Sequence, residues 1–497
     1  MHMSGIEEGV EKGVSRGSEE VATFECQTED GCAEQPLITM TVEVRLKATS
    51  LVDPMDCGSL KDAVNRLIME RGCINYADGP LEFTAFETAE YQSHLQHIEQ
   101  VVVTDTDHAL YRIGGLLMAW QFRLAIYVYQ VNEEEEPAED EEGEDGVPSY
   151  SEWLLPAAQF EGTWTSLHYE SSIKMRLLRY ATSALVFSDL NVNPHLVAWN
   201  RVVLLHGPPG TGKTSLCKAL AQKLAIRFSD RYRAASLVEV NAHSLFSKWF
   251  SESGKQVGKL FSKITELLEE PDVLVFVLID EIESLASARK GSGGVSEPSD
   301  AVRAVNALLT QLDALRRFPN AMVLTTSNIT QAIDVAFVDR ADIKAYIGPP
   351  GIAARFDIIR SSLLELCRVG IIHGSAAPLL WPYSKLQPFV GRLLPRHQAP
   401  PTTAVCGRAV VLPGGAHLAI SQDPEPEDVP ALQLSAALLG VAMATEGLSG
   451  RSLRKLPFLA HALSEGGLAC PCDCADFLHA LVHAAEHEHM DRRSLST

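Results

Sequence analysis

Long apolar segments are absent from this chain of 497 residues, and its longest apolar run is VLVFVLI at 273–279. A helix that spans a membrane needs roughly 18 or more consecutive apolar residues, so we expect no membrane contact. The first residues, MHMSGIEEGVEKGVSRGSEEV, also lack the apolar core of a secretory signal and the arginine-rich pattern of an organelle-targeting peptide. These absences predict a protein of the nucleus or the cytoplasm.

Positive charge is scarce as well, because 42 lysines and arginines stand against 64 aspartates and glutamates, for a net charge of −22. Much of the acidic excess lies in EEEEPAEDEEGEDG at 133–146, so the folded parts are nearer to neutral. Contact with nucleic-acid phosphates normally requires a basic surface. We therefore expect no direct nucleic-acid partner.

Cysteine is sparse, and 10 cysteines in a chain of this length predict reduced thiols rather than a disulfide framework. Cys470, Cys472 and Cys474 alternate along the chain, whereas zinc ligands usually follow C-x₂₋₄-C spacing. The alternation favours a loop followed by a solvated helix over a metal site.

The sequence does contain a complete phosphate-binding motif, GPPGTGKT, at 207–214. The apolar run 202–205 before it predicts a strand buried on both faces, and SLCKALAQKLA after it predicts a helix whose N-terminus faces an anion. Glycines in the loop permit positive φ, so that backbone N–H groups can point at a polyphosphate. The predicted nucleotide-contacting residues are Gly207, Pro208, Pro209, Gly210, Thr211, Gly212, Lys213, Thr214 and Ser215.

Within this motif, Lys213 is expected at the β and γ phosphates and Thr214 on a magnesium ion. Asp280 and Glu281 end the apolar strand 273–279, which predicts Asp280 as a second Mg²⁺ group and Glu281 as the residue that polarises the attacking water. The next strand, AMVLTTSN, delivers Asn328 at its end. A neutral amide there can orient the water without adding negative charge.

Charge at a phosphoryl-transfer transition state also calls for a guanidinium, and two arginines are candidates. Arg340, in IDVAFVDRAD, is a candidate arginine finger for the nucleotide of a neighbouring subunit. Arg451, in GLSGRSLRKL, is a candidate for the γ-phosphate of its own subunit.

Composition and periodicity divide the chain into segments of different character. Strand-like runs alternate with helical patterns around the phosphate-binding motif, which predicts a parallel sheet with right-handed crossovers. The expected segments are a disordered N-terminus (1–36), a small α+β domain (37–132), an acidic linker (133–149), a large α/β domain (150–350), a helical lid (351–490) with a proline-rich irregular insert at about 374–428, and a tail (491–497).

GPPGTGKT, LIDE, TTSN and the order of the two arginines together resemble an AAA+ ATPase. NAHSLFSKWFSESGK, DVAFVDRADIKAYIGPP and GLSGRSLRKLPFLAHAL resemble one branch of that class, the pachytene checkpoint ATPases that remodel HORMA-domain proteins. The resemblance implies an α/β AAA+ P-loop parallel sheet flanked by helices, a helical lid and a small N-terminal α+β domain. It also implies ATP and Mg²⁺ as ligands.

The same resemblance implies a homohexameric ring that converts HORMA-domain proteins from the closed to the open form, in spindle checkpoint silencing and in control of the meiotic chromosome axis. By position, Lys248, Trp249 and Phe250 match the family's substrate-gripping pore loop. The domain at 37–132 corresponds to the part that docks substrates and a HORMA-like adaptor.

Two stretches depart from the family pattern, namely the insert at 374–428 and the run YRIGGLLMAWQFRLA at 111–125. We interpret part of each as intron-derived or frame-shifted sequence, because a long structureless loop is unusual inside a compact domain. Two alternatives to a remodelling ATPase stay open on the sequence. One is a nucleotide-gated assembly scaffold with a defective lid, and the other is a nucleic-acid-loading AAA+ protein.

Overall fold

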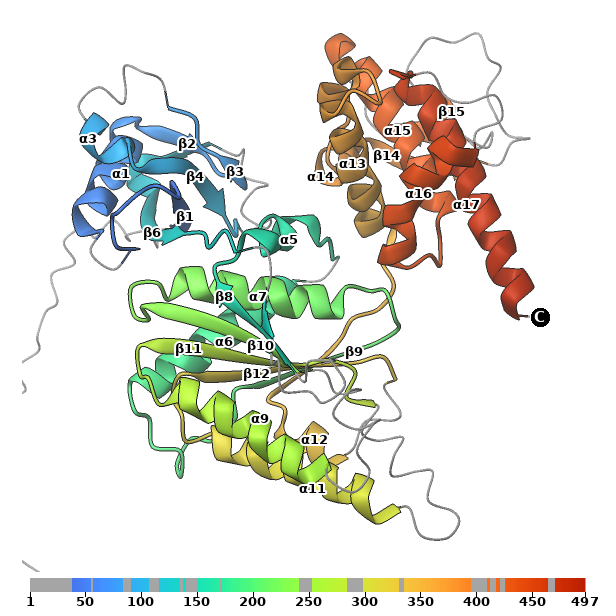
Figure 1. Cartoon of the computed structure of the whole chain (residues 1–497). Helices are drawn as coiled ribbons and strands as arrows, with labels where there is room; N and C mark the ends of the chain where they lie inside the picture. The colour runs from blue at the N-terminus through green and yellow to red at the C-terminus, as the bar shows by residue number, and fades with distance from the viewer. Residues whose placement is uncertain are drawn as a thin grey trace, which may run out of the picture.

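A computed structural model places three folded parts along the chain, namely an N-terminal domain, a large α/β domain and a C-terminal lid (Figure 1). The predicted N-terminal tail, most of the acidic linker and the predicted pore loop lie outside the described residues. The structure describes residues 38–54, 57–83, 91–106, 116–134, 137–139, 150–169, 172–240, 253–283, 298–329, 335–394, 409–411, 417–420, 425–463 and 470–496.

The N-terminal domain is a four-stranded sheet in the order β3-β4-β1-β6, with helix α1 packed on it. Central strand β1 is antiparallel to β4 and parallel to β6, with Ile38 aligned to Phe122 and Leu46 to Gln130. The bounds are β1 Ile38–Leu46, α1 Gly58–Glu70, β2 Cys73–Asn75, β3 Gly79–Pro80, α3 Gln92–Leu95, β4 Ile98–Thr104, β5 Leu116–Met118, η3 Ala119–Gln121 and β6 Phe122–Gln130.

The run at 111–125 does not behave as foreign sequence where the structure describes it. Its residues 116–118 form β5, which pairs with β2, and its last residues begin β6, which follows β1 over that strand's whole length. Phe122 is buried in the domain core. The alternating apolar residues of this stretch therefore complete the sheet, and the interpretation of this run as foreign sequence is wrong.

The large domain contains a seven-stranded sheet in the order β13-β9-β12-β11-β10-β8-β7. The strands from β13 to β10 are parallel, and the side chains of β9, β11 and β12, the strands with continuous apolar runs, are almost wholly buried. The bounds are β7 Ala138–Glu139, β8 Tyr150–Leu155, β9 Val202–His206, β10 Ala234–Val240, β11 Val273–Ile279, β12 Ala321–Ser327 and β13 Ile343–Tyr346.

The predicted parallel sheet is confirmed for β13 to β10, and two antiparallel strands extend it on one side. Strand β8 runs antiparallel to β10, and β7 runs antiparallel to β8. In β8, Trp153 and Leu155 are buried whereas Leu154 is exposed. Such alternation suits a strand near the edge of a sheet with one face covered, rather than a strand buried on both faces.

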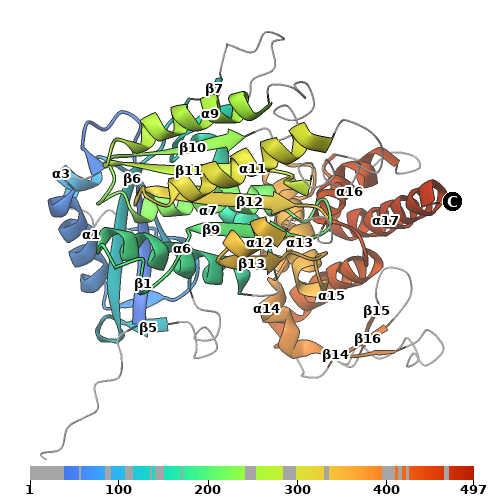
Figure 2. The same ribbon diagram turned by 90° about the horizontal axis from the view of Figure 1, so that it is seen from below.

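Helices cover both faces of this sheet (Figures 1 and 2). Helices α5, α6 and α7 bury their apolar sides against one face, and α9, α11 and α12 against the other. Three layers of this kind bury both faces of the central strands. The bounds are η4 Ala158–Phe160, α5 Thr163–Ser166, α6 Ile173–Asp189, α7 Lys213–Arg227, α9 Ser253–Leu268, α11 Pro298–Leu315 and α12 Val335–Arg340.

The lid is a helical bundle with its own apolar core, to which a small antiparallel sheet in the order β14-β16-β15 is attached. Its long helices are α13 Ile352–Arg368, α15 Val429–Ala444, α16 Gly450–Leu463 and α17 Cys474–Ser496. The shorter elements are η6 Gly374–Leu379, α14 Tyr383–Leu386, η7 Gln387–Phe389, β14 Val390–Leu394, β15 Ala409–Val411, β16 His417–Ile420 and η9 Pro426–Asp428.

Where it is described, the proline-rich stretch forms short helical turns and strands that belong to this lid, so these parts are not irregular. Its foreign origin stays a prediction. Leu380, Trp381, Leu386 and Leu418 are buried in the lid core together with residues of the long helices. Prolines end helices, but they do not prevent short helical turns and strands from burying the apolar residues between them. The C-terminal helix is likewise packed, because Phe477 and neighbouring apolar residues of α17 are buried.

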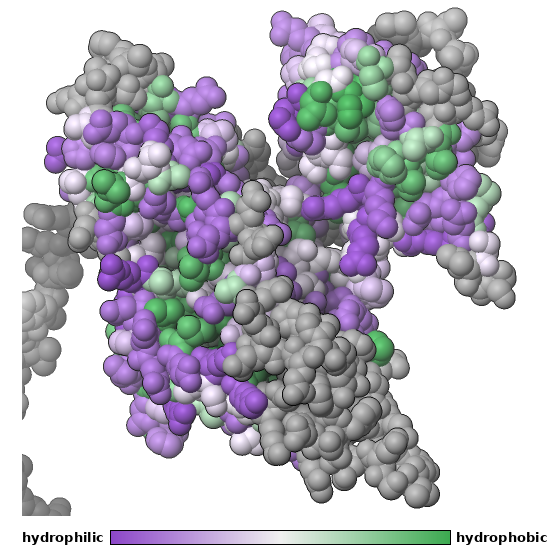
Figure 3. All heavy atoms as spheres, in the orientation of Figure 1, coloured by the Kyte–Doolittle hydropathy of each residue, from purple (hydrophilic) through white to green (hydrophobic). Residues whose placement is uncertain are grey.

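On the face drawn in Figure 3, apolar side chains gather on the lid and on the middle of the large domain, whereas the N-terminal domain is mostly hydrophilic. Among the helices that the structure describes, none combines the length and the apolar character that crossing a bilayer demands.

If the 374–428 stretch belongs to the lid, Trp381→Ala should destabilise that bundle by about 3 kcal/mol or more, because it leaves a cavity the size of an indole. Trp381 is 5% exposed, its ring lies 5.7 Å from that of Phe389, and the Lys385 ammonium lies 3.8 Å from its ring centre. Chemical denaturation followed by circular dichroism measures the change. Gln387→Ala, at an exposed position of the same stretch, is the matched control and should shift stability by less than about 0.5 kcal/mol.

Candidate nucleotide-binding and hydrolysis site

A pocket of about 510 Å³ opens where the carboxyl ends of the parallel strands meet the lid. The loop after β9 forms its floor, and the residues that follow β11 and β12 form one wall. The described lining residues are Thr163, Ser166, Leu167, His168, Tyr169, Pro209, Gly210, Thr211, Gly212, Lys213, Thr214, Ser215, Asp280, Glu281, Asn328, Gly348, Pro350, Ile358, Gly450, Arg451 and Arg454. The pocket therefore gathers all the predicted nucleotide and catalytic residues except Gly207, Pro208 and Arg340.

Gly207 starts the phosphate-binding loop in a conformation that only glycine tolerates. Its φ is +145°, and a Cβ atom there would lie 2.1 Å from the carbonyl oxygen of Ile347. The loop backbone then turns back through Gly210 and Gly212, both with positive φ. Helix α7 follows at once, so its first N–H groups face the pocket and suit a bound phosphate.

Lys213 is held over the loop by two backbone oxygens, because its ammonium donates to Gly207 O at 2.9 Å and to Pro208 O at 2.8 Å. Burial lowers the pKa of Lys213, and the nearby carboxylates Glu283 and Asp280 only partly oppose this effect. A buried ammonium without a bidentate carboxylate partner among the described residues is well suited to a phosphate anion.

Two oxygen-bearing side chains in the pocket fit a magnesium ion. The Thr214 hydroxyl donates to both carboxylate oxygens of Asp280, at 2.9 and 3.1 Å, and the Thr326 hydroxyl donates to Asp280 Oδ1. Magnesium prefers hard oxygen ligands and usually binds through one or two protein groups together with phosphates and water. Thr214 and Asp280 are such a pair, next to the loop that suits phosphates.

Glu281 and Asn328 lie side by side at the ends of neighbouring strands. The Asn328 amide donates to Glu281 Oε1 at 3.2 Å, and the Asn328 backbone N–H donates to Glu283 Oε1 at 3.0 Å. Glu281 has a φ of +56°, a strained value for a residue with a side chain. Strain of this kind is common at catalytic positions, where it fixes the direction of a functional group.

The lid closes the pocket through the start of α16. The Arg451 backbone N–H donates to Gly210 O at 3.1 Å, so the lid touches the phosphate-binding loop directly. Arg454, which the sequence reasoning did not select, donates from Nη2 to Ser166 O at 2.8 Å. Its position one helical turn after Arg451 was the available signal, because residues three apart share a helix face.

The segment just before α6 forms a second wall that sequence reasoning also missed. The Tyr169 hydroxyl lies 3.4 Å from the carbonyl oxygens of Thr211 and Gly212, so this wall contacts the loop. Burial lowers the pKa of His168 to about 4, which keeps its ring neutral near pH 7. Nothing in the residue types of SLHY marks this wall, because it becomes one only when the chain packs against the loop.

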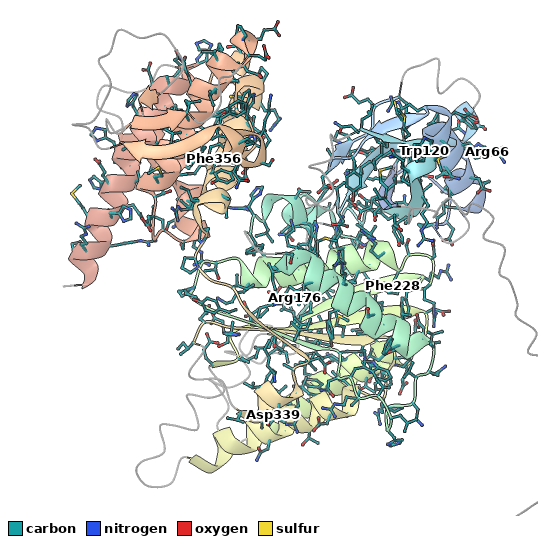
Figure 4. The ribbon with its side chains drawn as sticks, turned by 180° about the vertical axis from the view of Figure 1, so that it is seen from behind. Arg66, Trp120, Arg176, Phe228, Asp339 and Phe356 are labelled. Atoms are coloured by element: carbon teal, nitrogen blue, oxygen red, sulfur yellow. The ribbon has the colours of Figure 1, made fainter. Side chains whose placement is uncertain are left out.

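Arg340 lies outside the pocket, on α12, at the end of the large domain away from the N-terminal domain, where Figure 4 labels its neighbour Asp339. Its guanidinium is paired bidentately with Asp313, with Nε–Oδ1 and Nη2–Oδ2 distances of 3.0 and 2.7 Å. This hydrogen bonding raises the pKa of Arg340. The chain therefore does not bring Arg340 to its own nucleotide pocket.

Comparisons with known proteins agree with this geometry. The family model described as "ATPase family associated with various cellular activities (AAA)" matches residues 203–349. A model for the TRIP13 N-terminal domain matches residues 35–134, and one for the C-terminal lid of TRIP13-like AAA+ ATPases matches residues 415–489. Sheet, pocket and lid thus define an AAA+ ATPase. Two of these models span part of the stretches that the sequence interpretation treated as foreign.

Similar proteins show to which family of AAA+ ATPases the chain belongs. The Oryza sativa subsp. indica pachytene checkpoint protein 2 homolog is 49% identical over 92% of this chain and 88% of its own. The human homolog is 43% identical over 93% and 96% of the two chains. The solved structure of C. elegans PCH-2 matches with a TM-score of 0.65, at 29% identity, over 91% of this chain and 100% of the other. The chain belongs to the pachytene checkpoint protein 2 family.

The close backbone approach at Gly207 predicts that Gly207→Ala weakens ATP binding about tenfold or more, because the loop must shift to relieve a contact with a backbone oxygen. Titration with a fluorescent ATP analogue measures the affinity. Gly258→Ala, on α9 with no atom within 4 Å of the added Cβ, is the control and should bind ATP like the unmodified chain. Equal affinities of both variants would contradict the role given to the Gly207 approach.

Proposed function

We propose that this chain hydrolyses ATP in the described pocket and uses the energy to remodel HORMA-domain proteins. The observation that carries the proposal is the meeting of the phosphate-binding loop, the Asp280–Glu281 pair, Asn328 and the lid residue Arg451 around one cavity. Each group has the chemistry that phosphoryl transfer requires, namely phosphate binding, a metal ligand, activation of water and compensation of charge.

The described residues divide the work of hydrolysis. Lys213 and the N–H groups of the loop hold the phosphates, and Thr214 with Asp280 would hold magnesium, which neutralises phosphate charge when it is bound. Glu281 takes a proton from the attacking water, and Asn328 fixes the orientation of both Glu281 and that water. Arg451 stabilises the charge that develops on the γ-phosphate. The direct contact between Arg451 and Gly210 favours an active lid over the scaffold alternative.

By analogy with the family, the subunits would form a homohexameric ring. A neighbouring subunit would then supply a second guanidinium to the γ-phosphate. Arg340 stands away from its own pocket and is oriented by Asp313 and by Ala336 O, which accepts from Nη1 at 2.7 Å. A guanidinium held rigidly on an outer helix can complete the site of a neighbour. We therefore propose Arg340 as an arginine finger that acts between subunits.

The substrates follow from family membership and from the sequence resemblance. We propose HORMA-domain proteins with a HORMA-like adaptor as partners, and closed-to-open conversion as the product of the cycle, in spindle checkpoint silencing and on meiotic chromosome axes. The work would take place in the nucleus and the cytoplasm, without direct binding of nucleic acid or membrane. Lys248, Trp249 and Phe250, outside the described residues, are proposed to grip the threaded polypeptide, because broad aromatic faces hold a chain without sequence preference.

Glu281→Gln should retain ATP binding and lower the hydrolysis rate by about 10²- to 10⁴-fold, because the amide cannot accept the proton from water. Conversion of a closed HORMA protein, followed by ion-exchange separation of the two conformers, should fall with it. Glu269→Gln, on the loop after α9 and exposed, is the matched control and should leave both activities unchanged. Hydrolysis by Glu281→Gln at the original rate would refute the role of Glu281, and ATP hydrolysis without conformer exchange would refute the proposed substrate.

Mixing two inactive variants tests the role of Arg340 between subunits. Arg340→Ala should slow hydrolysis about 10³- to 10⁵-fold. A mixture with Glu281→Gln should regain activity, because an Arg340→Ala subunit keeps its own Glu281 and receives Arg340 from its neighbour. Arg451→Ala mixed with Glu281→Gln is the control, since both defects then lie within a subunit's own pocket. Recovery in the control mixture, or none in the first, would contradict these assignments.

A further inference from the structure

Four charged side chains are buried where the N-terminal domain meets the back of α7. Glu43 and Asp105 come from the N-terminal domain, and Lys223 and Arg227 come from α7. Their side chains are 8%, 4%, 6% and 14% exposed. Lys223 pairs with Glu43 and Arg227 pairs with Asp105, and Lys223 Nζ lies 3.5 Å from Asp105 Oδ2. The charges balance, and separation of the two domains would take each buried charge away from its partner.

Asp105 also contacts a residue of the large domain outside α7. Its second oxygen, Oδ1, accepts from the indole N–H of Trp164 at 3.1 Å. Burial alone would raise the pKa of Asp105, but Lys223 and Arg227 outweigh that effect and the pKa is lowered. Asp105 also has a φ of +59°, an uncommon backbone conformation for a residue with a side chain. Aspartate tolerates this conformation better than most residues with a side chain.

From Trp164 the contacts continue to the nucleotide pocket. The Lys174 ammonium lies 5.0 Å from the Trp164 ring centre and donates to Trp164 O at 2.6 Å and to Leu167 O at 3.2 Å. Leu167 lines the nucleotide pocket, as do its neighbours His168 and Tyr169. Lys174 thus connects Trp164 to the pocket wall at 167–169.

The charge of Asp105 also bears on Lys174. Burial lowers the pKa of Lys174 to about 8, and the charge of Asp105 is the largest opposing influence, ahead of that of Asp78. An N-terminal domain that moves away removes this carboxylate and the acceptor of the indole at the same time. Lys174, which makes the two carbonyl contacts to Trp164 and Leu167, would then lose its largest favourable charge interaction.

We propose that Asp105 is a positioning residue that couples docking of the N-terminal domain to nucleotide affinity, through Trp164, Lys174 and the pocket wall at 167–169. The inference rests on the proposed function only in requiring that the pocket bind ATP. Coupling of this kind is reciprocal, so ATP tightens the docking of the N-terminal domain, and a protein partner that displaces this domain weakens ATP binding.

A simple adhesive role for the buried charges predicts something different. Lys61 and Asp230 form another ion pair across the same boundary, with side chains 23% and 50% exposed. Neither residue is among the described lining residues of the pocket, and the side chains of Lys61 and Asp230 hydrogen-bond to each other. If domain adhesion alone mattered, loss of either pair would act through stability and would leave ATP affinity unchanged in the folded protein.

The test uses the full chain, a fluorescent ATP analogue and the variants Asp105→Asn and Lys61→Met. Asp105→Asn keeps an oxygen acceptor for Trp164 but removes the charge, and should raise the dissociation constant about fivefold or more. Lys61→Met should change it less than about twofold. Circular dichroism and thermal melting establish that each variant is folded.

A double-variant cycle separates positioning from general damage. If Asp105 acts through Lys174, Asp105→Asn should cause no further loss of affinity in a Lys174→Met background. Trp164→Phe removes the indole N–H and reduces the ring that faces Lys174, so it should weaken binding in the same direction. This variant tests the path if Asp105→Asn does not fold.

Three outcomes would overturn the coupling: unchanged affinity in both folded Asp105→Asn and Trp164→Phe, additive losses in the double variant, or an equal loss in Lys61→Met. Failure of the unmodified chain to bind ATP would instead overturn the proposed function, so the two failures are distinguishable.

Discussion

The active centre depends on one constraint, the alignment of three neighbouring parallel strands whose carboxyl ends reach the same edge of the sheet. β9 ends in the phosphate-binding loop, β11 in Asp280 and Glu281, and β12 in Asn328. Their register is fixed by apolar side chains on both faces, since a shift by one residue would exchange the two buried sets. The large hydrophobic core therefore fixes the positions of the polar groups at the strand ends, which lie outside that core.

The lid and the wall at 167–169 complete the site from two other directions. Arg451 approaches the loop from the lid, and Tyr169 approaches it from the segment before α6. The lid and this wall are packed independently, so the pocket can change shape when one of them moves. The groups at the strand ends keep their positions relative to one another, because the core of the sheet holds them. This division suits the proposed coupling of nucleotide turnover to movement.

The residue pattern alone predicted the features that depend on residues close together in the sequence. Continuous apolar runs located β9, β11 and β12, and the motif with its glycines located the loop and Lys213. The pattern could not reveal Tyr169 or the pairing of Arg340 with Asp313, because each depends on contact between segments distant in the sequence. Arg454 was within reach, since it lies one helical turn after Arg451 on the same helix. Prolines misled the interpretation of 374–428, where burial of Trp381 and Leu418 by the lid core overrides the weak local helix signals.

The topology of the N-terminal domain has a consequence for synthesis of the chain. β1 leaves the ribosome early, yet one of its two sheet neighbours is β6, which aligns Ile38 with Phe122. Pairings between such distant residues form slowly, because a long loop must first close. Until residue 130 has emerged, one edge of an apolar strand stays open to unwanted pairing, so the nascent chain is exposed to aggregation before its ATPase domain has been made.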